Sequence, residues 1–297
     1  MNPKSNPNEK EVSALLTFLA DPSEHTVALA KDHLRRILQR HPGYKNLLQS
    51  STDPAIAARA RIFLEETRLE ELKNAFEVLA AQGRDLDLEQ GTILLAQSAY
   101  PSLDPLTVSR ALDRLAEGVE KELENEEASA TREAMIIRRH LFDRLGFMGN
   151  EQNYYDPDNS YIHRVLERKM GIPISLSCVY LFVAKRLDIP AYGVGLPGHF
   201  IIGHDTPNGI IYIDPFHRGR ILTRNDCVEI LRQRRLVFQE AFLAPTPNHQ
   251  VLTRTIANLV NLYTDEQQPS VSLEFLQQGQ PERAQWLMQI LALFENG

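Results

Sequence analysis

The stretch GIPISLSCVY, residues 171–180, decides the fold because it places a cysteine near the start of an apolar helix. After a Gly-Ile-Pro turn, apolar side chains continue on almost every side of a helix expected over Ser175–Leu187. A helix of this kind is buried at the centre of its domain. Ser175 is a typical N-cap residue, so we expect Cys178 at the third helical position.

Cys178 is a candidate nucleophile. Near a helix start the backbone N–H groups are unpaired and the helix dipole is positive, so the pKa of a thiol there is expected to fall. A thiolate that forms near neutral pH is an effective nucleophile. The alternative is that Cys178 only fills space, because free cysteine is among the most buried residue types.

Three β-rich runs follow the helix, at Ala191–Leu196, His199–Gly203 and Ile210–Ile213. The break between the second and third runs contains Asn-Gly, a strong hairpin signal, so these two runs should pair antiparallel. Side chains alternate along a strand, and for a loop of either two or four residues His199 and Asp214 share one face. The predicted fold class is therefore α+β, with the cysteine-bearing helix packed on an antiparallel sheet.

His199 in PGHF, residues 197–200, and Asp214 in IDPF, residues 213–216, complete a candidate catalytic triad with Cys178. In such a set the imidazole is the base and the carboxylate orients it. A histidine after Pro-Gly is commonly a turn residue, and Asp-Pro commonly ends a strand. The combination of all three residues in this order therefore carries more weight than any one of them.

Stabilisation of an oxyanion is the remaining requirement of acyl chemistry. The backbone N–H of Cys178 is one candidate donor, and Asn159, Tyr154 and Tyr161 are weaker candidates from the loop before the helix.

A metal site is a further alternative for the same region. Its ligands would come from a group of histidines and aspartates whose chemistry suits zinc: His199, His204, Asp205, Asp214 and His217. Their spacing matches no familiar zinc motif. We therefore predict no metal and no cofactor.

The N-terminal part of the chain has helical patterns and a faint internal repeat. Its elements recur 32 residues apart, with Leu15-Leu16, Asp21-Pro22 and Ala28 matched by Leu47-Leu48, Asp53-Pro54 and Ala60. The repeat indicates two helical hairpins, although two unrelated helix pairs would give a similar pattern.

The residues from 141 to 203, LFDRLGFMGNEQNYYDPDNSYIHRVLERKMGIPISLSCVYLFVAKRLDIPAYGVGLPGHFIIG, together with IYIDPF, resemble the transglutaminase-like core of the SirB-one family. LDLEQGTILLAQSAYPSLD, residues 86–104, resembles the helical lead-in of that family. The resemblance implies a papain-like core in which a central helix presents Cys178 and adjacent strands supply His199 and Asp214. It also implies a short tetratricopeptide-like tail, whose first helix contains RTIANLVNLY.

We therefore expect three regions: a repeat-like helical region at 1–83, the transglutaminase-like core with its lead-in at 84–240, and a helical tail at 241–297. The expected function is thiol-dependent acyl transfer or amide hydrolysis. The alternative is a weakly active or inactive regulatory or adaptor protein that binds a protein or peptide partner. The N-terminal repeat and the acidic run ELENEEASATRE, residues 122–133, motivate this alternative.

Composition excludes several other classes of protein. A formal net charge of −7 argues against nucleic acid or an anionic membrane as the main partner. Two cysteines, Cys178 and Cys227, cannot form a disulfide framework, and the N-terminus has no apolar run typical of a signal peptide. We expect a soluble cytoplasmic protein, while its substrate and oligomeric state stay open.

Overall fold

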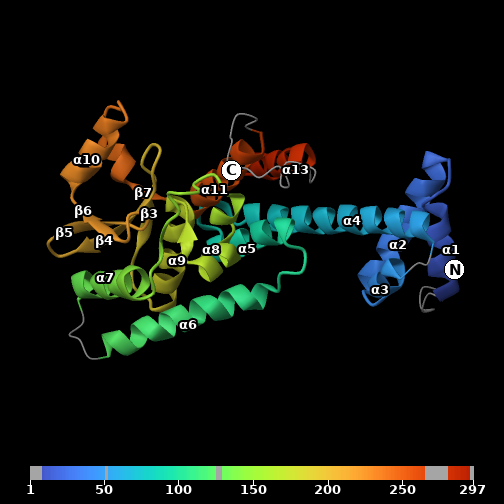
Figure 1. Cartoon of the computed structure of the whole chain (residues 1–297), viewed down its shortest axis with the longest axis horizontal. Coiled ribbons are helices and arrows are strands. Elements are labelled where there is room, and N and C mark those ends of the chain that lie inside the picture. The colour runs from blue at the N-terminus through green and yellow to red at the C-terminus, as the bar shows by residue number, and fades with distance from the viewer. Residues whose placement is uncertain (1–8, 51–52, 125–128, 265–279, 295–297) are drawn as a thin grey trace. The chain divides into compact units, whose positions relative to one another are not determined.

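A computed structural model of the protein describes residues 9–50, 53–124, 129–264 and 280–294 (Figure 1). Residues 125–128 of the acidic run and residues 265–279 and 295–297 of the expected tail lie outside these ranges. The chain divides into two compact units, Met1–Asn74 and Ala75–Gly297. Within the described ranges, no helix combines the length and the apolar character that crossing a bilayer requires.

The first unit consists of packed helices. Its elements are α1 (Glu9–Phe18), α2 (Glu24–Arg40), α3 (Tyr44–Gln49) and the first part of α4 (Pro54–Ala80). Ser23 begins α2 as its N-cap, and its side chain accepts a hydrogen bond from the Thr26 N–H. Leu16, Leu48 and Phe63 belong to one buried apolar cluster. Both predicted pairs of helices with a break between them are therefore present.

The second unit contains the rest of α4 and the remaining helices. These are η1 (Gly83–Asp85), α5 (Leu88–Ala99), α6 (Pro105–Leu123), α7 (Ala130–Arg138), η2 (Arg139–Arg144), η3 (Pro157–Asn159), α8 (Ile162–Arg168), α9 (Pro173–Arg186), α10 (Arg224–Gln233), η4 (Glu240–Leu243), α11 (Asn248–Thr264) and α13 (Gln280–Ala292). Asp87 and Asp104 cap α5 and α6, each by accepting a hydrogen bond from a backbone N–H of the first turn.

The second unit also contains the strands. An antiparallel sheet has the order β6-β5-β4-β3-β7, and a short parallel pair joins β1 to β2. The strands are β1 (Met148–Gly149), β2 (Met170–Gly171), β3 (Tyr192–Val194), β4 (Ile201–Thr206), β5 (Gly209–Asp214), β6 (Arg220–Leu222) and β7 (Pro245–Thr246). The predicted α+β fold class is confirmed.

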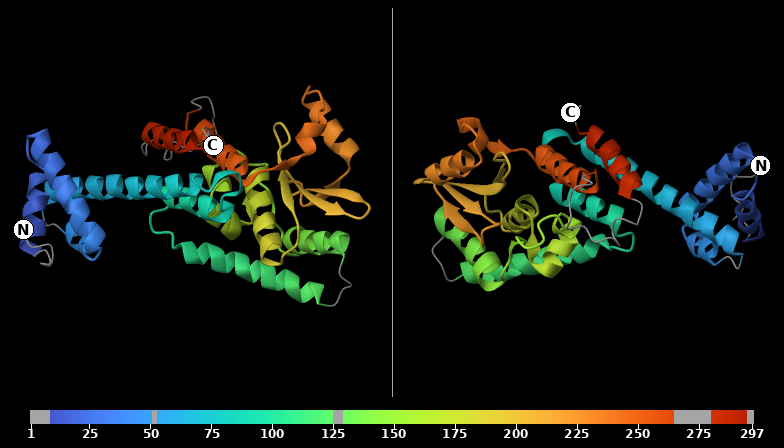
Figure 2. Two further views of the ribbon diagram at one scale, coloured as in Figure 1. Left: turned by 180° about the vertical axis from the view of Figure 1, so that it is seen from behind. Right: turned by 45° about the horizontal axis from the view of Figure 1, so that its top comes forward.

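Helices cover both faces of the antiparallel sheet (Figures 1 and 2). On one face, Tyr180 of α9 contacts His204 of β4. On the other face, Ile201 of β4 and Tyr212 of β5 belong to a buried cluster with Leu231 of α10. Neighbouring residues of a strand point to opposite faces, so Ile201 and His204, three residues apart, point into different layers.

The helix α9 is as buried as its composition predicts, but it begins earlier than expected. Pro173 is its first residue and Ile172 its N-cap. Ser175 is the third helical residue, and its Oγ accepts a hydrogen bond from the Ile172 N–H at 3.1 Å. The prediction that Ser175 is the N-cap and Cys178 the third residue is therefore wrong, since Cys178 is the sixth. Proline has a backbone angle already suited to the first helical position, and it starts the helix.

The predicted hairpin is confirmed. Ile202 pairs with Ile213 and Thr206 with Gly209, which leaves residues 207 and 208 as the turn. In this register, continuation of the ladder by one residue places Asp214 opposite Ile201, two residues after His199. The short strands β6 and β7 were not predicted, because neither is long enough to show alternation.

The first helix of the expected tail packs within the second unit. The helix α11 contacts α5, α9 and α13. Asn248 at its start donates a hydrogen bond from Nδ2 to the Leu86 carbonyl at 2.9 Å, and the hydroxyls of Tyr263 and Tyr161 lie 2.8 Å apart. The helix α11 thus connects the lead-in helix α5 to the central part of the unit.

Replacement of Tyr180 by Phe should destabilise the second unit by about 1–3 kcal/mol, because it leaves buried polar groups without a partner. The Tyr180 hydroxyl lies 2.8 Å from His204 Nε2 and 3.1 Å from the Ala134 carbonyl oxygen. Urea unfolding followed by circular dichroism measures the change. Tyr212→Phe is the matched control, since the Tyr212 hydroxyl has no hydrogen-bond partner in the described part of the chain. Equal stability of the two variants would contradict the prediction.

Candidate functional site

The centre of the candidate site is the Asp214 carboxylate, which is 1% exposed. Its Oδ2 lies 2.8 Å from His199 Nε2 and 2.7 Å from His217 Nδ1. Its Oδ1 accepts hydrogen bonds from the backbone N–H groups of Phe216 and His217. The predicted sharing of a face by His199 and Asp214 is confirmed, and their separation of two residues lies within diagonal reach.

The charge of this carboxylate is strongly stabilised. Burial alone would raise the pKa of Asp214, but the hydrogen bonds and charges of His199 and His217 outweigh it and hold that pKa well below its usual range. The hydrogen bond to Asp214 also raises the pKa of His217, whose side chain is half-exposed. An ionised Asp214 accepts protons only in hydrogen bonds, so each imidazole directs an N–H toward it.

The second nitrogen of His199 is available for chemistry. Nδ1 has no hydrogen-bond partner among the residues that the structure describes, and it is not one of the fully enclosed polar atoms there. The His199 ring lies edge-to-face against Phe216, with ring centroids 6.4 Å apart. The imidazole is thus fixed by a carboxylate on one side and an aromatic ring on another, and Nδ1 has no competing hydrogen bond in the described ranges.

The Cys178 thiol is buried within α9. Cys178 is 1% exposed, and burial raises the pKa of its thiol to about 12. No hydrogen bond joins Cys178 to His199 or to any other side chain in the described ranges. The expected fall in the pKa of the thiol is wrong, because the sixth residue of a helix is beyond the unpaired N–H groups and desolvation dominates.

The two cysteines lie on helices that cover opposite faces of the sheet. Tyr212 and Asp214 are two residues apart on β5, so both point toward α10. Burial, followed by the charges of Asp226 and Asp214, raises the pKa of Cys227 in α10 to about 11. Cys178 belongs to α9 on the other face, about 200° around the helix from Tyr180, which contacts the sheet. The structure therefore brings His199 and Asp214 together, and no hydrogen bond joins Cys178 to either of them in the described ranges.

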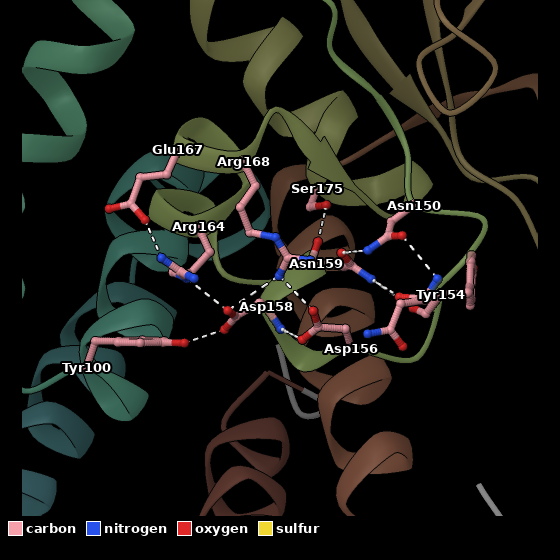
Figure 3. Close-up of polar contacts among 11 residues, drawn as sticks. Tyr100, Asn150, Tyr154, Asp156, Asp158, Asn159, Arg164, Glu167, Arg168 and Ser175 are labelled. Carbon is pink, nitrogen blue, oxygen red and sulfur yellow. Dashed lines mark hydrogen bonds and ion pairs between the residues drawn. The ribbon is translucent and has the colours of Figure 1, made fainter. Parts of the chain in front are cut away.

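The loop before α8 is held by a buried amide network (Figure 3). Asn159 is completely buried, and its Nδ2 donates to the carbonyls of Asn153 and Tyr154 at 2.7 and 3.1 Å. Its Oδ1 accepts from Asn150 Nδ2 at 2.9 Å. Its backbone carbonyl accepts from Ser175 Oγ at 2.5 Å, which fixes the loop to the first turn of α9.

Ion pairs hold the other end of this loop (Figure 3). Arg164 Nε lies 2.8 Å from Asp158 Oδ2, and Arg168 Nη1 lies 2.7 Å from Asp156 Oδ2. The hydroxyl of Tyr100 in α5 also bonds to Asp158. The network is a rigid support, in which each charged group is satisfied by a neighbour.

Gly149 connects this loop to the His199–Asp214 pair. It lies next to Gly171 in the pairing of β1 with β2, and its N–H donates to the Phe216 carbonyl at 2.9 Å. A Cβ atom at Gly149 would lie 2.4 Å from the Phe216 ring. Only glycine permits this close approach, which places Phe216 against His199.

The three oxyanion candidates from the loop have different surroundings. The side chain of Asn159 is used fully within the amide network, and the Tyr161 hydroxyl bonds to Tyr263. Tyr154 is 38% exposed, and its ring packs against Phe216 with centroids 5.8 Å apart. Of the three, Tyr154 is therefore the one that can meet a bound molecule.

Three residues of this region could hold a metal ion. One ligand atom from each of His199, Asp214 and His217 lies within 4.8 Å of the others. The other two residues considered from the sequence lie apart, since His204 contacts Tyr180 and Asp205 accepts a bond from Tyr192. The three atoms already satisfy one another by hydrogen bonds, so the cluster is complete without an ion.

His217 was not assigned a role in the triad from the sequence. Its only signal is the spacing Asp214-x-x-His217, which brings a side chain back over a carboxylate within one tight turn. This spacing is common in turns and has low specificity.

Comparisons with known proteins cover the whole of this site. The model of the Transglutaminase-like superfamily matches residues 106–257. A UPF0162 protein of Xylella fastidiosa (strain 9a5c) is 35% identical over 188 residues, which are 61% of this chain and 66% of that protein. The chain thus spans slightly less than two thirds of that relative. A UPF0162 protein of Pseudomonas aeruginosa is 28% identical over 190 residues, 63% of this chain and 68% of that protein.

A human protein is also similar to part of the chain. F-box only protein 21 of Homo sapiens is 36% identical over 130 residues, which are 41% of this chain and 20% of that protein. No solved structure matches the chain.

Replacement of His217 by Gln should change stability in a pH-dependent way. The pKa of His217 is raised by Asp214 in the folded protein, so its stabilising effect is complete below the unfolded pKa of about 6.5 and is lost as pH rises through the folded pKa. Urea unfolding should therefore show a larger difference between wild type and variant at pH 6 than at pH 9. His249→Gln is the control, and a difference that grows with pH would contradict the prediction.

Both cysteines should resist alkylation in the folded protein. Cys178 and Cys227 are buried, with thiol pKa values raised to about 12 and about 11. Iodoacetamide at pH 7.5 should label them only after urea is added, because the thiolate is the reactive form. Mass spectrometry of digested protein measures each site. Rapid labelling of Cys178 without urea would show that the thiol reaches a reactive environment.

Proposed function

This chain belongs to the transglutaminase-like superfamily, and on that premise we propose that it hydrolyses an acyl compound with His199 as the general base and Asp214 as its orienter. The observation that carries the proposal is the distance of 2.8 Å between His199 Nε2 and the buried Asp214 Oδ2. An imidazole fixed in this way has a defined orientation and a defined tautomer.

The other ring nitrogen performs the proton transfer. With Nε2–H directed at Asp214, Nδ1 of neutral His199 carries the lone pair. It takes a proton from water as the water oxygen bonds to the carbonyl carbon of the substrate. The intermediate then loses its amine or alcohol, which receives the proton from the imidazolium. The net reaction adds water across one C–N or C–O bond and leaves the protein unchanged.

Water is the proposed nucleophile in preference to Cys178. Thiol-dependent transfer through Cys178 would require the thiol to leave a fully buried position and to lose a proton at a pKa of about 12. Water needs only access to His199 Nδ1, which has no competing partner in the described ranges. The competing mechanism is the one predicted from the sequence, in which Cys178, His199 and Asp214 act as a triad. The experiment below distinguishes the two.

We also propose a closer kinship with the SirB-one family and a tetratricopeptide-like character for the C-terminal helices. The first rests on the resemblance of residues 141–203, and the second on the packing of α11 against α13. Both are compatible with an acyl hydrolase that has a helical tail.

The test is turnover of a panel of acyl esters and anilides by wild type and three variants. His199→Ala should lower kcat/KM by about 10²-fold or more, the range of general base catalysis, and Asp214→Asn should lower it by about tenfold or more. Cys178→Ala should stay within about threefold of wild type. The exposed His25 provides a matched control as His25→Ala.

The outcomes separate the mechanisms. If Cys178→Ala lowers kcat/KM as much as His199→Ala does, the nucleophile is the thiol and not water. Equal activity of His199→Ala and wild type would overturn the proposal. If no acyl compound is turned over, the alternative function as a partner-binding regulatory or adaptor protein takes its place.

A further inference from the structure

Two arginines hold the backbone of the loop that carries His199. Arg254 of α11 donates from Nη2 to the carbonyls of Leu196 and His199, at 3.0 and 2.7 Å. Arg234, at the end of α10, donates from Nη1 to the Gly198 carbonyl. Two guanidinium groups from different helices therefore converge on residues 196–198 and on the carbonyl next to the imidazole.

Neither arginine has an acidic partner. Within the described ranges no carboxylate forms an ion pair with Arg234 or Arg254. Some other arginines of the unit do pair with carboxylates, as Arg186 does with Glu89 and Asp113 at 2.6 and 2.7 Å. A partly buried cation without an acidic partner is costly, and an anionic ligand would offset that cost.

The two charges also act on each other. Burial and the positive charge of Arg234 lower the pKa of Arg254, and the group that opposes them is the Tyr154 phenol. Burial raises the pKa of Tyr154, whereas Arg234 and Arg254 lower it. The two guanidinium groups and the Tyr154 phenol thus lie close enough to influence one another, and the two positive charges together would stabilise an anion.

Aromatic rings shape this region. The Arg254 guanidinium lies over the Phe200 ring, 5.5 Å from its centroid, which holds it in place. Tyr154 packs on Phe216, and Phe216 packs on His199. Arg234 and Tyr154 are exposed and Arg254 is half-buried, so each of the three side chains has surface in contact with solvent.

We infer that Arg234, Arg254 and the Tyr154 hydroxyl form a carboxylate-binding subsite beside His199. The inference rests on the proposed function, since it defines the substrate class as an acyl compound that also carries a carboxylate. Arginine suits this role because its planar group donates parallel hydrogen bonds to a planar carboxylate. The carboxylate would bind at the subsite and the acyl carbonyl at His199 Nδ1.

Binding can be tested without turnover. The probes are N-benzoylglycine and its neutral amide, which have the same shape and differ in charge. NMR titration should give at least about tenfold tighter binding of N-benzoylglycine by wild type, the gain of one or two charge-assisted hydrogen bonds. Arg234→Gln and Arg254→Lys should each lose this preference, the first by removing a charge and the second by removing the planar group. Arg232→Gln, two residues before Arg234 in the last turn of α10 and 79% exposed, should keep it.

Several results would overturn the inference. These are equal binding of the two probes by wild type, no binding of N-benzoylglycine, or an unchanged preference in Arg234→Gln combined with Arg254→Lys. Displacement of N-benzoylglycine by inorganic phosphate but not by acetate would assign the subsite to phosphate instead.

The His199→Ala variant separates this inference from the proposed function. It should keep the preference for N-benzoylglycine, because His199 does not bind the carboxylate. A preserved preference in a protein that turns over no acyl compound would support the subsite and reject hydrolysis. Turnover of neutral and anionic substrates with equal kcat/KM would reject the subsite and support hydrolysis.

Discussion

The structure around the site depends on one buried negative charge. Asp214 has its carboxylate almost completely removed from water, and two imidazoles and two backbone N–H groups replace the lost hydration. A charge in this position is tolerated only while its partners stay in place. The turn at 214–217 and the PGHF loop are therefore constrained together, although they belong to different strands. Loss of either imidazole would leave the carboxylate partly unsatisfied and would disturb both segments.

Sequence reasoning predicted the parts that periodicity controls. Alternation along β4 and β5 placed His199 and Asp214 on one face, and the apolar pattern of α9 predicted its central burial. Sequence reasoning was wrong where one residue type fits two different positions at the start of a helix. Ser175 satisfies the preferences of an N-cap and also those of a third helical residue that reaches back, and Pro173 decides between them. The earlier start places Cys178 three residues further into the helix. The electrostatic argument for a low thiol pKa no longer applies at that position. The assignment of the catalytic residues and the three-region division of the chain stay predictions.

The positive region beside His199 contrasts with the acidic chain as a whole. The formal net charge is −7, and yet Arg234 and Arg254 lie near each other without acidic partners in the part of the chain that the structure describes. By comparison, Arg164 and Arg168 of α8 are neutralised by Asp158 and Asp156. On a protein with a negative net charge, a small positive area attracts an anionic ligand to that area alone. His199 lies in the same short loop whose backbone carbonyls accept the hydrogen bonds of Arg234 and Arg254.

The hairpin that carries Asp214 has a practical consequence. Its turn consists of residues 207 and 208, which are exposed, and its ladder begins with Thr206 opposite Gly209. One residue inserted inside either strand would reverse the alternation and send the carboxylate to the opposite layer. Extra residues at the tip leave the ladder unchanged. The tip is thus a permissive graft point, where a fluorophore or a short epitope would report on the sheet without altering the geometry at its far end.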